Sequence, residues 1–275
     1  MSHRIGHQPS TKTISITSGK GGVGKSTLVA NLGQYLGKKG HRVLLLDGDL
    51  GMSNLDIMYN VATAFSVEHV ISGRKFLEDI VVEVAPNVSL IPGGSGVFGL
   101  SDLNIMEKRL LMEQVSRLEQ HFDYMLIDTA PGIADSVLYL NAAAQETLVI
   151  ITPDPSSVTD AYALIKVLHQ RYRENRFSIV CNMVQDQQEA NRLYQRFSDV
   201  VSQFLCVSLD LVGFVPLDQE LRRATKSQQL IIEKSPQASA AVAIRNVGEK
   251  LRVFKDIEHT KGGMQFFWEQ IVGVA

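Results

Sequence analysis

The sequence SGKGGVGKST, residues 18–27, sets the fold and limits the chemistry of the whole chain. A glycine, four further residues and then Gly-Lys-Ser fit the pattern G-x-x-x-x-G-K-[ST], in which a glycine-rich loop surrounds a phosphate group. The flanking residues supply the required context, because residues 13–18 predict a buried strand and residues 26–40 predict a helix. The alternative, a glycine-rich turn that binds no ligand, leaves that context unexplained.

Most positions of this loop have a chemical task. Glycine lets backbone N–H groups approach phosphate oxygens without obstruction by a side chain, and the positive end of the following helix faces the anion. Lys25 is expected to reach the β- and γ-phosphates, and the Ser26 hydroxyl is expected to hold Mg²⁺. The predicted nucleotide-binding residues of the loop are Gly21, Gly22, Val23, Gly24, Lys25, Ser26 and Thr27. Lys20, the other lysine of the loop, has no task in this scheme.

The composition excludes several classes of protein. The 275 residues carry 27 basic and 29 acidic side chains, a formal net charge of −2, so no direct contact with nucleic acid is expected. No apolar run reaches the roughly 18 residues of a membrane span, and residues 1–12 do not resemble a signal peptide. Two isolated cysteines, Cys181 and Cys206, indicate a reducing compartment, so a cytoplasmic location is expected.

Strands and helices alternate along the chain, which predicts an α/β fold with a doubly wound, mostly parallel sheet and helices on both faces. The predicted strands are almost continuous apolar runs, which is typical of a sheet covered on both sides. We expect strands at residues 13–18, 42–47, 87–93, 124–132, 146–154, 177–184 and 209–216, and helices at 26–40, 104–122, 135–145, 157–172 and 188–205. The predicted organisation is a flexible tail (1–12), one P-loop ATPase domain (13–254) and a C-terminal segment (255–275).

Acidic residues follow two of the strands. Asp128 ends the run MLID and fits an aspartate that binds Mg²⁺ through water, although it could instead cap the following turn. The second strand runs into DGDLGMSNLD, which contains Asp47, Asp49 and Asp56. Ligands bind beyond the carboxyl ends of parallel strands, so one of these is a candidate for orienting the attacking water; three solvated loop acids are the alternative. Gly132 is expected to offer its N–H to the γ-phosphate.

The base is indicated by a comparison of strand ends. Guanine-specific P-loop proteins of the small GTPase type end a strand in Asn-Lys-x-Asp, whereas the sixth predicted strand here ends in CNMVQD. Asn182 can pair with a purine edge, but lysine and aspartate do not follow at that spacing, so adenine is favoured and the expected cofactors are ATP and Mg²⁺. An ordinary turn residue is the alternative for Asn182. Pro216, which ends the seventh predicted strand, is also expected to bind the nucleotide.

With its early lysine, GKGGVGKS resembles the deviant Walker A motif of the family that contains MinD, ParA and the nitrogenase iron protein. In that family the early lysine, here Lys20, reaches the nucleotide of the partner subunit, and two ATP molecules lie between the subunits of a homodimer. The resemblance implies catalytic roles for Lys20, Lys25 and Asp49, of which Asp49 orients water. It also implies a Mg²⁺ site at Ser26, Asp128 and Asp49. A lysine from each subunit compensates the negative charge of the two nucleotides.

Two further stretches narrow the resemblance. DGDLGMSNLD is similar to the switch segment of MinD-like proteins, and PDPSSVTDAYALIKVL, residues 153–168, is similar to a helix of the FlhG/FleN flagellar-number regulators. The resemblance implies an ATP-dependent dimerisation switch with slow ATP hydrolysis, which regulates flagellar number, placement or gene expression. Its implied partners are flagellar regulators: an FlhF-type GTPase, a flagellar switch protein or a transcription activator. Residues 1–12 lack the Asp-Gln-Ala…Leu-Arg segment with which some members activate FlhF, so that activation is not expected here.

Two other functions are compatible with the same fold. The first is a MinD- or ParA-like ATPase that positions the division site or another cargo. The second is an iron–sulfur carrier or reductase component, which would need cysteines at an exposed subunit interface. Cys181 lies within a predicted strand, Cys206 follows a predicted helix, and no C-x-x-C occurs, so the sequence disfavours this second alternative.

The last residues predict an amphipathic helix. After Gly262-Gly263, apolar residues recur at helical spacing on one face, namely Met264, Phe267, Trp268, Ile271, Val272 and Ala275. Aromatic side chains on such a face suit a bilayer interface, and relatives in the family end in similar helices. One expectation is therefore reversible, peripheral contact with the inner membrane through Met264–Ala275. The other is packing on the protein's own core, because the polar face lacks the basic residues of strong lipid binders.

Overall fold

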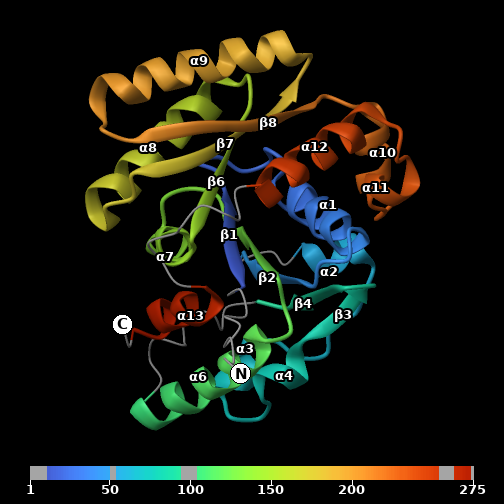
Figure 1. Ribbon diagram of the computed structural model, residues 1–275, viewed down its shortest axis with the longest axis vertical. Helices are drawn as coiled ribbons and strands as arrows, with labels where there is room; N and C mark the ends of the chain where they lie inside the picture. Colours follow the sequence, from blue (N-terminus) through green and yellow to red (C-terminus); the bar gives the residue numbers. More distant parts are fainter. Residues whose placement is uncertain (1–10, 50–53, 94–103, 254–262, 274–275) are drawn as a thin grey trace, which may run out of the picture.

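The structure, a computed structural model, describes residues 11–49, 54–93, 104–253 and 263–273 (Figure 1). Its strands are β1 (Lys12–Thr17), β2 (Val43–Gly48), β3 (Val82–Ala85), β4 (Val88–Ile91), β5 (Tyr124–Thr129), β6 (Glu146–Ile151), β7 (Arg176–Val184) and β8 (Ser208–Pro216). Its helices are α1 (Lys25–Lys38), α2 (Leu55–Tyr59), α3 (Val67–Ile71), α4 (Leu77–Ile80), α6 (Ile105–Glu119), α7 (Asp135–Ala143), α8 (Pro155–Tyr172), α9 (Gln187–Phe204), α10 (Gln219–Lys226), α11 (Ile231–Lys234), α12 (Ser239–Val253) and α13 (Met264–Val272). Every strand and helix predicted from the sequence is present, with ends that differ by a few residues.

The described strands form one sheet in the order β3-β4-β2-β5-β1-β6-β7-β8. All neighbouring strands are parallel except β3 and β4, so the predicted mostly parallel, doubly wound sheet is confirmed. The antiparallel edge strand β3 was not predicted. Its sequence VEVA is short and only half buried, so it lacks the long apolar run on which the strand predictions relied.

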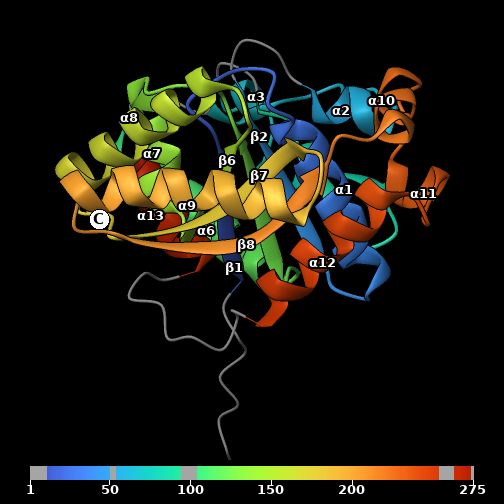
Figure 2. The ribbon, with the colours of Figure 1, turned by 90° about the horizontal axis from the view of Figure 1, so that it is seen from above.

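Helices cover both faces of the sheet (Figures 1 and 2). On one face, α1 and α12 pack over a core to which β5 contributes Leu126. On the other face, α6, α7 and α13 cover a core that includes the preceding residue, Met125, while α8 and α9 cover β6 and β7. Alternate residues of each strand therefore enter opposite cores, which explains why β1, β2 and β5 are buried along their whole length.

The parallel strands bring their carboxyl ends to one edge of the sheet. Asp47 of β2 is directly opposite Asp128 of β5, and β1, the other neighbour of β5, leads into the glycine-rich loop. The topology thus places the loop and the aspartates together, as expected for a ligand site in an open α/β sheet.

The C-terminal helix α13 packs against α6, α7 and β1. Five of the six residues of the predicted apolar face, Met264, Phe267, Trp268, Ile271 and Val272, are buried in this contact; Ala275 lies outside the described residues. The indole Nε1 of Trp268 is buried without a hydrogen-bond partner among the described residues. Packing on the core is therefore the arrangement observed here. Within the described ranges, no helix is both long and apolar enough to cross a bilayer.

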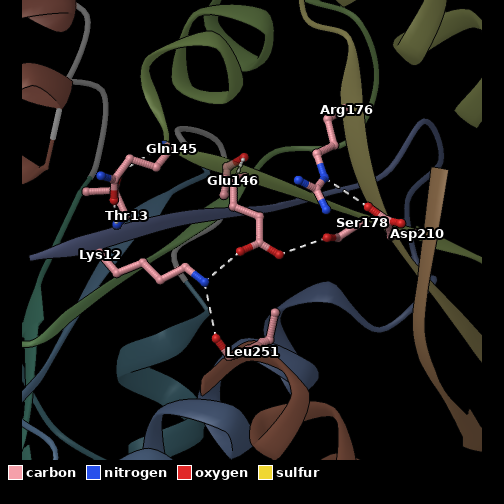
Figure 3. Close-up of polar contacts among 9 residues, drawn as sticks. Lys12, Thr13, Gln145, Glu146, Arg176, Ser178, Asp210 and Leu251 are labelled. Atoms are coloured by element: carbon pink, nitrogen blue, oxygen red, sulfur yellow. Dashed lines mark hydrogen bonds and ion pairs between the residues drawn. The ribbon is translucent and has the colours of Figure 1, made fainter. Parts of the chain in front are cut away.

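A buried ion pair joins β1 and β6 at the amino ends of the strands, opposite the site (Figure 3). Lys12 Nζ lies 2.9 Å from Glu146 Oε2 and donates to the carbonyl of Leu251, in the last turn of α12, at 3.1 Å. The other oxygen of Glu146 accepts a hydrogen bond from Ser178 Oγ of β7 at 2.8 Å. Lys12, which we assigned to the N-terminal tail, is thus the first residue of β1 and joins three elements that are distant in sequence; residues 1–10 lie outside the described residues.

This ion pair yields a stability prediction. Glu146→Leu leaves the Lys12 cation buried without its carboxylate, so it should lower the free energy of unfolding by about 3 kcal/mol or more. Adding Lys12→Met should restore most of that loss, because neither charge is then buried. Urea unfolding of the two variants measures the difference. As a control, breaking the more exposed Arg176–Asp210 pair (2.9 Å) with Arg176→Ala should lower it by less than about 1 kcal/mol. Equal losses for Glu146→Leu and Arg176→Ala would contradict the interpretation.

Candidate nucleotide-binding site

The loop between β1 and α1 has the conformation that the motif predicts. Gly22 and Gly24 have φ angles of +75° and +91°, in the left-handed region that favours glycine. Helix α1 begins at Lys25, directly after Gly24, so the N–H groups of its first turn have no partners within the helix and face the loop. An anion bound here meets these donors and the positive end of the helix dipole.

Gly19, the first glycine of the motif, is required for packing. A Cβ atom at this position would lie 2.1 Å from the carbonyl carbon of Asp160 and 2.6 Å from the nitrogen of Ala161, both in the backbone of α8. No side chain fits at such distances. The motif attributes its glycines to the approach of phosphate, whereas Gly19 permits the approach of a helix.

A cavity of about 780 Å³ lies beside the loop, a volume within the usual range of small-molecule sites. Nine of the predicted site residues line it: Gly21, Gly22, Gly24, Lys25, Ser26, Thr27, Asp49, Asn182 and Pro216. Four described residues that we also predicted do not line it: Lys20, Val23, Asp128 and Gly132. The carboxyl ends of β7 and β8 thus lie at the same cavity as the phosphate loop.

Several residues of the cavity wall were not predicted from the sequence, among them Pro131 and Met183. The others come from two segments: α2 and the residue before it supply Asn54, Ile57 and Met58, and α10 and its ends supply Leu217, Asp218, Leu221, Arg222, Thr225, Lys226 and Gln228. The motif that contains Asp49 also contains Asn54, and α10 follows Pro216 almost directly. Proximity in sequence to these predicted residues was therefore the available signal.

Lys25, which lines the cavity, and Asp128, which does not, are both buried, with 7% and 1% of their surfaces exposed. Burial lowers the pKa of Lys25, and the carboxylates of Asp128 and Asp49 oppose that effect. Burial raises the pKa of Asp128 to about 7; the nearby Ser26 hydroxyl acts to lower this pKa, and Asp47 acts to raise it. An ionised Asp128 is thus disfavoured until a cation compensates it.

The surroundings of Asp128 fit a magnesium ion. Both of its carboxylate oxygens are buried and have no hydrogen-bond partner within the described residues. Nowhere in the described residues is a group of three or more His, Cys, Asp or Glu side chains placed to hold a metal by itself. Mg²⁺ is commonly held by one or two carboxylates together with phosphate oxygens and water. Ser26, Asp128 and Asp49 would therefore hold it jointly with the nucleotide.

Asp47 has a structural role in this arrangement. It is fully buried, and its Oδ2 accepts hydrogen bonds from the N–H groups of Asn54 (3.0 Å) and Leu55 (3.2 Å) at the start of α2. Its Oδ1 accepts the N–H of Asp49 at 3.2 Å. Because Asp47 organises the backbone around it, Asp49, which lines the cavity, is the better placed of the two to meet a water molecule. Asp56 does not line the cavity.

Gly132 is tied to the phosphate loop in this structure. Its φ angle is +97°, and its N–H donates to the carbonyl of Ser18 at 2.9 Å. The predicted contact of this N–H with a γ-phosphate therefore requires the bond to Ser18 to open.

Lys20 lies outside the cavity and is held by the N-terminus of α8. Its Nζ donates to Asp154 Oδ2 at 2.5 Å and to Ser156 Oγ at 2.6 Å. Asp154 accepts hydrogen bonds from Lys20 Nζ, from the Ser156 hydroxyl and from the Ser156 N–H, and these bonds, in that order of effect, lower the pKa of Asp154 to about 2. Asp154 also caps α8 by accepting the N–H of Ser156. The segment PDPSS thus supplies the partner of the early lysine.

Together, the loop, the buried aspartate and the cavity define a P-loop NTPase. A family model described as ParA, NUBPL iron-transfer P-loop NTPase, matches residues 10–252, and the chain belongs to this family. It is 35% identical over 269 residues to the antiactivator FleN of Pseudomonas aeruginosa, covering 98% of this chain and 96% of that one. It is 32% identical to the flagellum site-determining protein YlxH of Helicobacter pylori, and the match covers 95% of this chain and 90% of that one.

Solved structures agree with this assignment. The MinD cell division protein of Aquifex aeolicus superposes with a TM-score of 0.70 at 26% identity, covering 88% of this chain and 98% of that one. The Pyrococcus horikoshii MinD in complex with Mg-ADP gives the same TM-score and identity, covering 91% and 99%. The sequence-based resemblance to the MinD/ParA family and to its flagellar regulators is therefore confirmed.

Among the described residues, neither cysteine belongs to a group of three or more His, Cys, Asp or Glu side chains that could hold a metal ion. Cys181 is buried and donates to the carbonyl of Ala190, and burial raises the pKa of its thiol to about 12. Cys206 is exposed, and both are free thiols. A thiol with so high a pKa is a poor metal ligand, because the thiolate is the form that binds.

The buried carboxyl of Asp128 yields a pH-dependent prediction. A rise in its pKa from 3.8 to about 7 on folding corresponds to roughly 4 kcal/mol of lost stability when the group is ionised. Asp128→Asn should therefore stabilise the ligand-free protein by up to about that amount at pH 8. The gain should shrink as the pH falls from about 7 towards 4, where Asp128 is protonated in the folded state.

Urea unfolding at pH 8 and at pH 4.5 measures this effect. Asp56→Asn, which removes a partly exposed carboxylate nearby, should change stability little at either pH. The same Asp128→Asn protein should lose Mg²⁺-dependent hydrolysis. If Asp128→Asn destabilised the ligand-free protein at pH 8, the carboxylate would be a structural cap, as in the turn-cap alternative.

Proposed function

We propose that this protein is a Mg²⁺-dependent ATPase that acts as a slow switch: ATP favours a homodimer, and hydrolysis releases it. The supporting features are the phosphate loop, the Asp128 site and the similarity to MinD structures, one of which holds Mg-ADP. On this proposal the cofactors are ATP and Mg²⁺. Dimerisation governed by the nucleotide provides the two states that any such switch requires.

The observation that supports a dimer most directly is the position of Lys20. Lys25 lines the cavity and already provides a lysine for the phosphates, whereas Lys20 points to Asp154 and Ser156 outside it. Because its side chain is 39% exposed, Lys20 is accessible to an approaching subunit. On our proposal it leaves Asp154 and contacts the phosphates bound by the partner subunit, where it compensates their charge.

Hydrolysis on this proposal uses residues that line the cavity, together with the buried Asp128. Lys25 binds the β- and γ-phosphates, and Asp49 orients the attacking water. Ser26 and Asp128 hold Mg²⁺, which when bound neutralises charge that develops on the phosphate oxygens. The burial of Lys25 and Asp128 keeps these charges in a poorly screened environment, where they act more strongly on the nucleotide than at the surface.

We propose further that the switch regulates flagellar number, flagellar placement or flagellar gene expression. The support is the similarity of nearly the whole chain to FleN, which is named an antiactivator, and to YlxH, which is named a flagellum site-determining protein. The partners on this proposal are a transcription activator, a flagellar switch protein or an FlhF-type GTPase. A positioning ATPase for division sites is the second candidate, because the chain is also 30% identical to the septum site-determining protein MinD of Bacillus subtilis.

The role of Lys20 can be tested by its removal. Lys20→Ala should still bind ATP through Lys25 but should fail to form the ATP-dependent dimer, because it removes the charge that crosses to the partner. Light scattering after size exclusion, with ADP or a non-hydrolysable ATP analogue, measures the mass. Lys39→Ala, which removes an exposed lysine paired with Glu249 far from the loop, is the control and should dimerise normally. Equal dimer formation by Lys20→Ala and wild type would refute the proposal.

Reversible contact with the inner membrane is a further part of this proposal. In the structure the apolar face of α13 is buried, so contact with lipid requires the helix to leave α6 and α7. The buried Nε1 of Trp268 has no hydrogen-bond partner among the described residues, and a donor left unpaired on docking makes docking less favourable by about 1–3 kcal/mol, which assists release. A dimer presents two such helices, and their combined binding is stronger than that of one. On this proposal the protein is cytoplasmic and peripheral to the membrane.

Sedimentation with anionic liposomes tests membrane contact. The full chain should sediment with vesicles in the presence of a non-hydrolysable ATP analogue and remain in the supernatant with ADP. A chain that ends at Gly262 should remain in the supernatant in both states, because it lacks the apolar helix. If the full chain also stays in the supernatant with the ATP analogue, α13 is a structural lid and the membrane proposal fails.

A further inference from the structure

Asn182 lies at the carboxyl end of β7, on the wall of the nucleotide cavity, and contacts the phosphate loop directly. Only 7% of its surface is exposed. Its Nδ2 donates to the carbonyl of Val23 at 2.6 Å, and its Oδ1 accepts the N–H of Met183 at 2.9 Å. The side-chain amide therefore bridges two backbone segments: the middle of the phosphate loop and the end of a strand two positions away in the sheet.

The bond to Val23 fixes the orientation of one peptide group of the phosphate loop. A peptide unit is planar, and its C=O and N–H point in opposite directions. The carbonyl of Val23, which accepts from Asn182, belongs to the same peptide unit as the N–H of Gly24. By holding the oxygen on one side, Asn182 sets the direction of that N–H on the other. Without the bond, this unit of the loop could rotate and turn its carbonyl towards the anion.

The absence of a side chain at Gly24 keeps this contact close. A Cβ atom there would lie 2.5 Å from Asn182 Nδ2 and 3.9 Å from Met183 Cε. A larger residue at Gly24 would displace the amide from Val23. Two features thus require glycine at position 24: its left-handed φ angle of +91° and the close approach of Asn182.

The second bond of Asn182 supports an unusual backbone conformation. Met183 has a φ angle of +59°, which residues with a side chain rarely adopt. Its N–H is the one that Asn182 Oδ1 accepts, and its own side chain lines the cavity. Asn182 therefore shapes the end of β7 at the same time as it holds the loop.

From these contacts we propose that Asn182 is a positioning residue that presets the phosphate loop, independently of the base of the nucleotide. The proposal rests on the proposed function, in that it takes the cavity to bind ATP. It differs from base recognition, because a positioning role affects any ligand with a polyphosphate chain. A role limited to the purine edge affects only ligands that carry a purine.

Inorganic tripolyphosphate separates the two roles, since it has phosphates and no base. The dissociation constants of Mg-ATP and of Mg-tripolyphosphate are measured by calorimetry for the full chain and three variants. Asn182→Ala should weaken both ligands by the same factor, about tenfold, which corresponds to about 1.4 kcal/mol. Asn182→Asp keeps the size of the side chain and the acceptor for Met183 but cannot donate to Val23, so it should weaken both ligands as well.

Asn191→Ala is the matched control. Asn191 has the same side chain but is exposed on α9, where it accepts a hydrogen bond from Gln187, and it does not line the cavity. Its truncation should leave the affinity for both ligands unchanged. Hydrogen exchange of the ligand-free proteins provides a second measurement: the amides of residues 23–26 should exchange faster in Asn182→Ala and Asn182→Asp than in wild type and Asn191→Ala.

The possible outcomes are distinct. If Asn182→Ala weakens ATP and leaves tripolyphosphate unchanged, Asn182 reads the base and the positioning role is refuted. Unchanged affinity for both ligands, or unchanged exchange of the loop amides, also refutes it. If wild type binds neither ligand, the proposed function fails, and the exchange of residues 23–26 in the ligand-free variants still decides the positioning role.

Discussion

The close approach of Gly19 to the backbone of α8 is the contact on which the arrangement of the site depends. A Cβ atom at Gly19 would lie 2.1 Å from a backbone atom of Asp160, so only glycine allows the phosphate loop and α8 to touch. The same helix presents Asp154 and Ser156 to Lys20. Any shift of α8 therefore acts at once on the start of the loop and on the lysine. Helix α8, which holds Lys20, and the phosphate loop are therefore expected to move together.

The site buries charged groups whose ionised forms are unfavourable in the ligand-free protein. Asp128 is buried with neither carboxylate oxygen hydrogen-bonded among the described residues, and burial also disfavours the charged form of Lys25. Neither group is placed to stabilise the empty protein. Both become favourable when a nucleotide with its metal ion supplies the missing charges. The stability given up here in the ligand-free state is a source of affinity for the ligand.

The sequence was sufficient wherever a pattern is local. Apolar runs predicted the strands of the parallel sheet, the glycine spacing predicted the phosphate loop, and the spacing from Met264 to Val272 predicted the apolar face of α13, with lipid and the protein core both left open as what it contacts. Contacts between distant residues could not be read in this way. Lys20 and Asp154 are 134 positions apart, and Val23 and Asn182 are 159 apart. Only the order of the strands brings such partners together, and neither residue alone identifies its partner.

The attachment of the chain ahead of α13 has a consequence for how this helix competes with other surfaces. Lys12 holds the last turn of α12 through the carbonyl of Leu251, a short distance in sequence before Met264. A helix tethered so closely meets its docking site at an effective concentration on the order of millimolar. Even weak docking is then well populated, and any outside surface must exceed that local concentration to capture the helix. The tether, as much as the apolar face, sets the threshold for release.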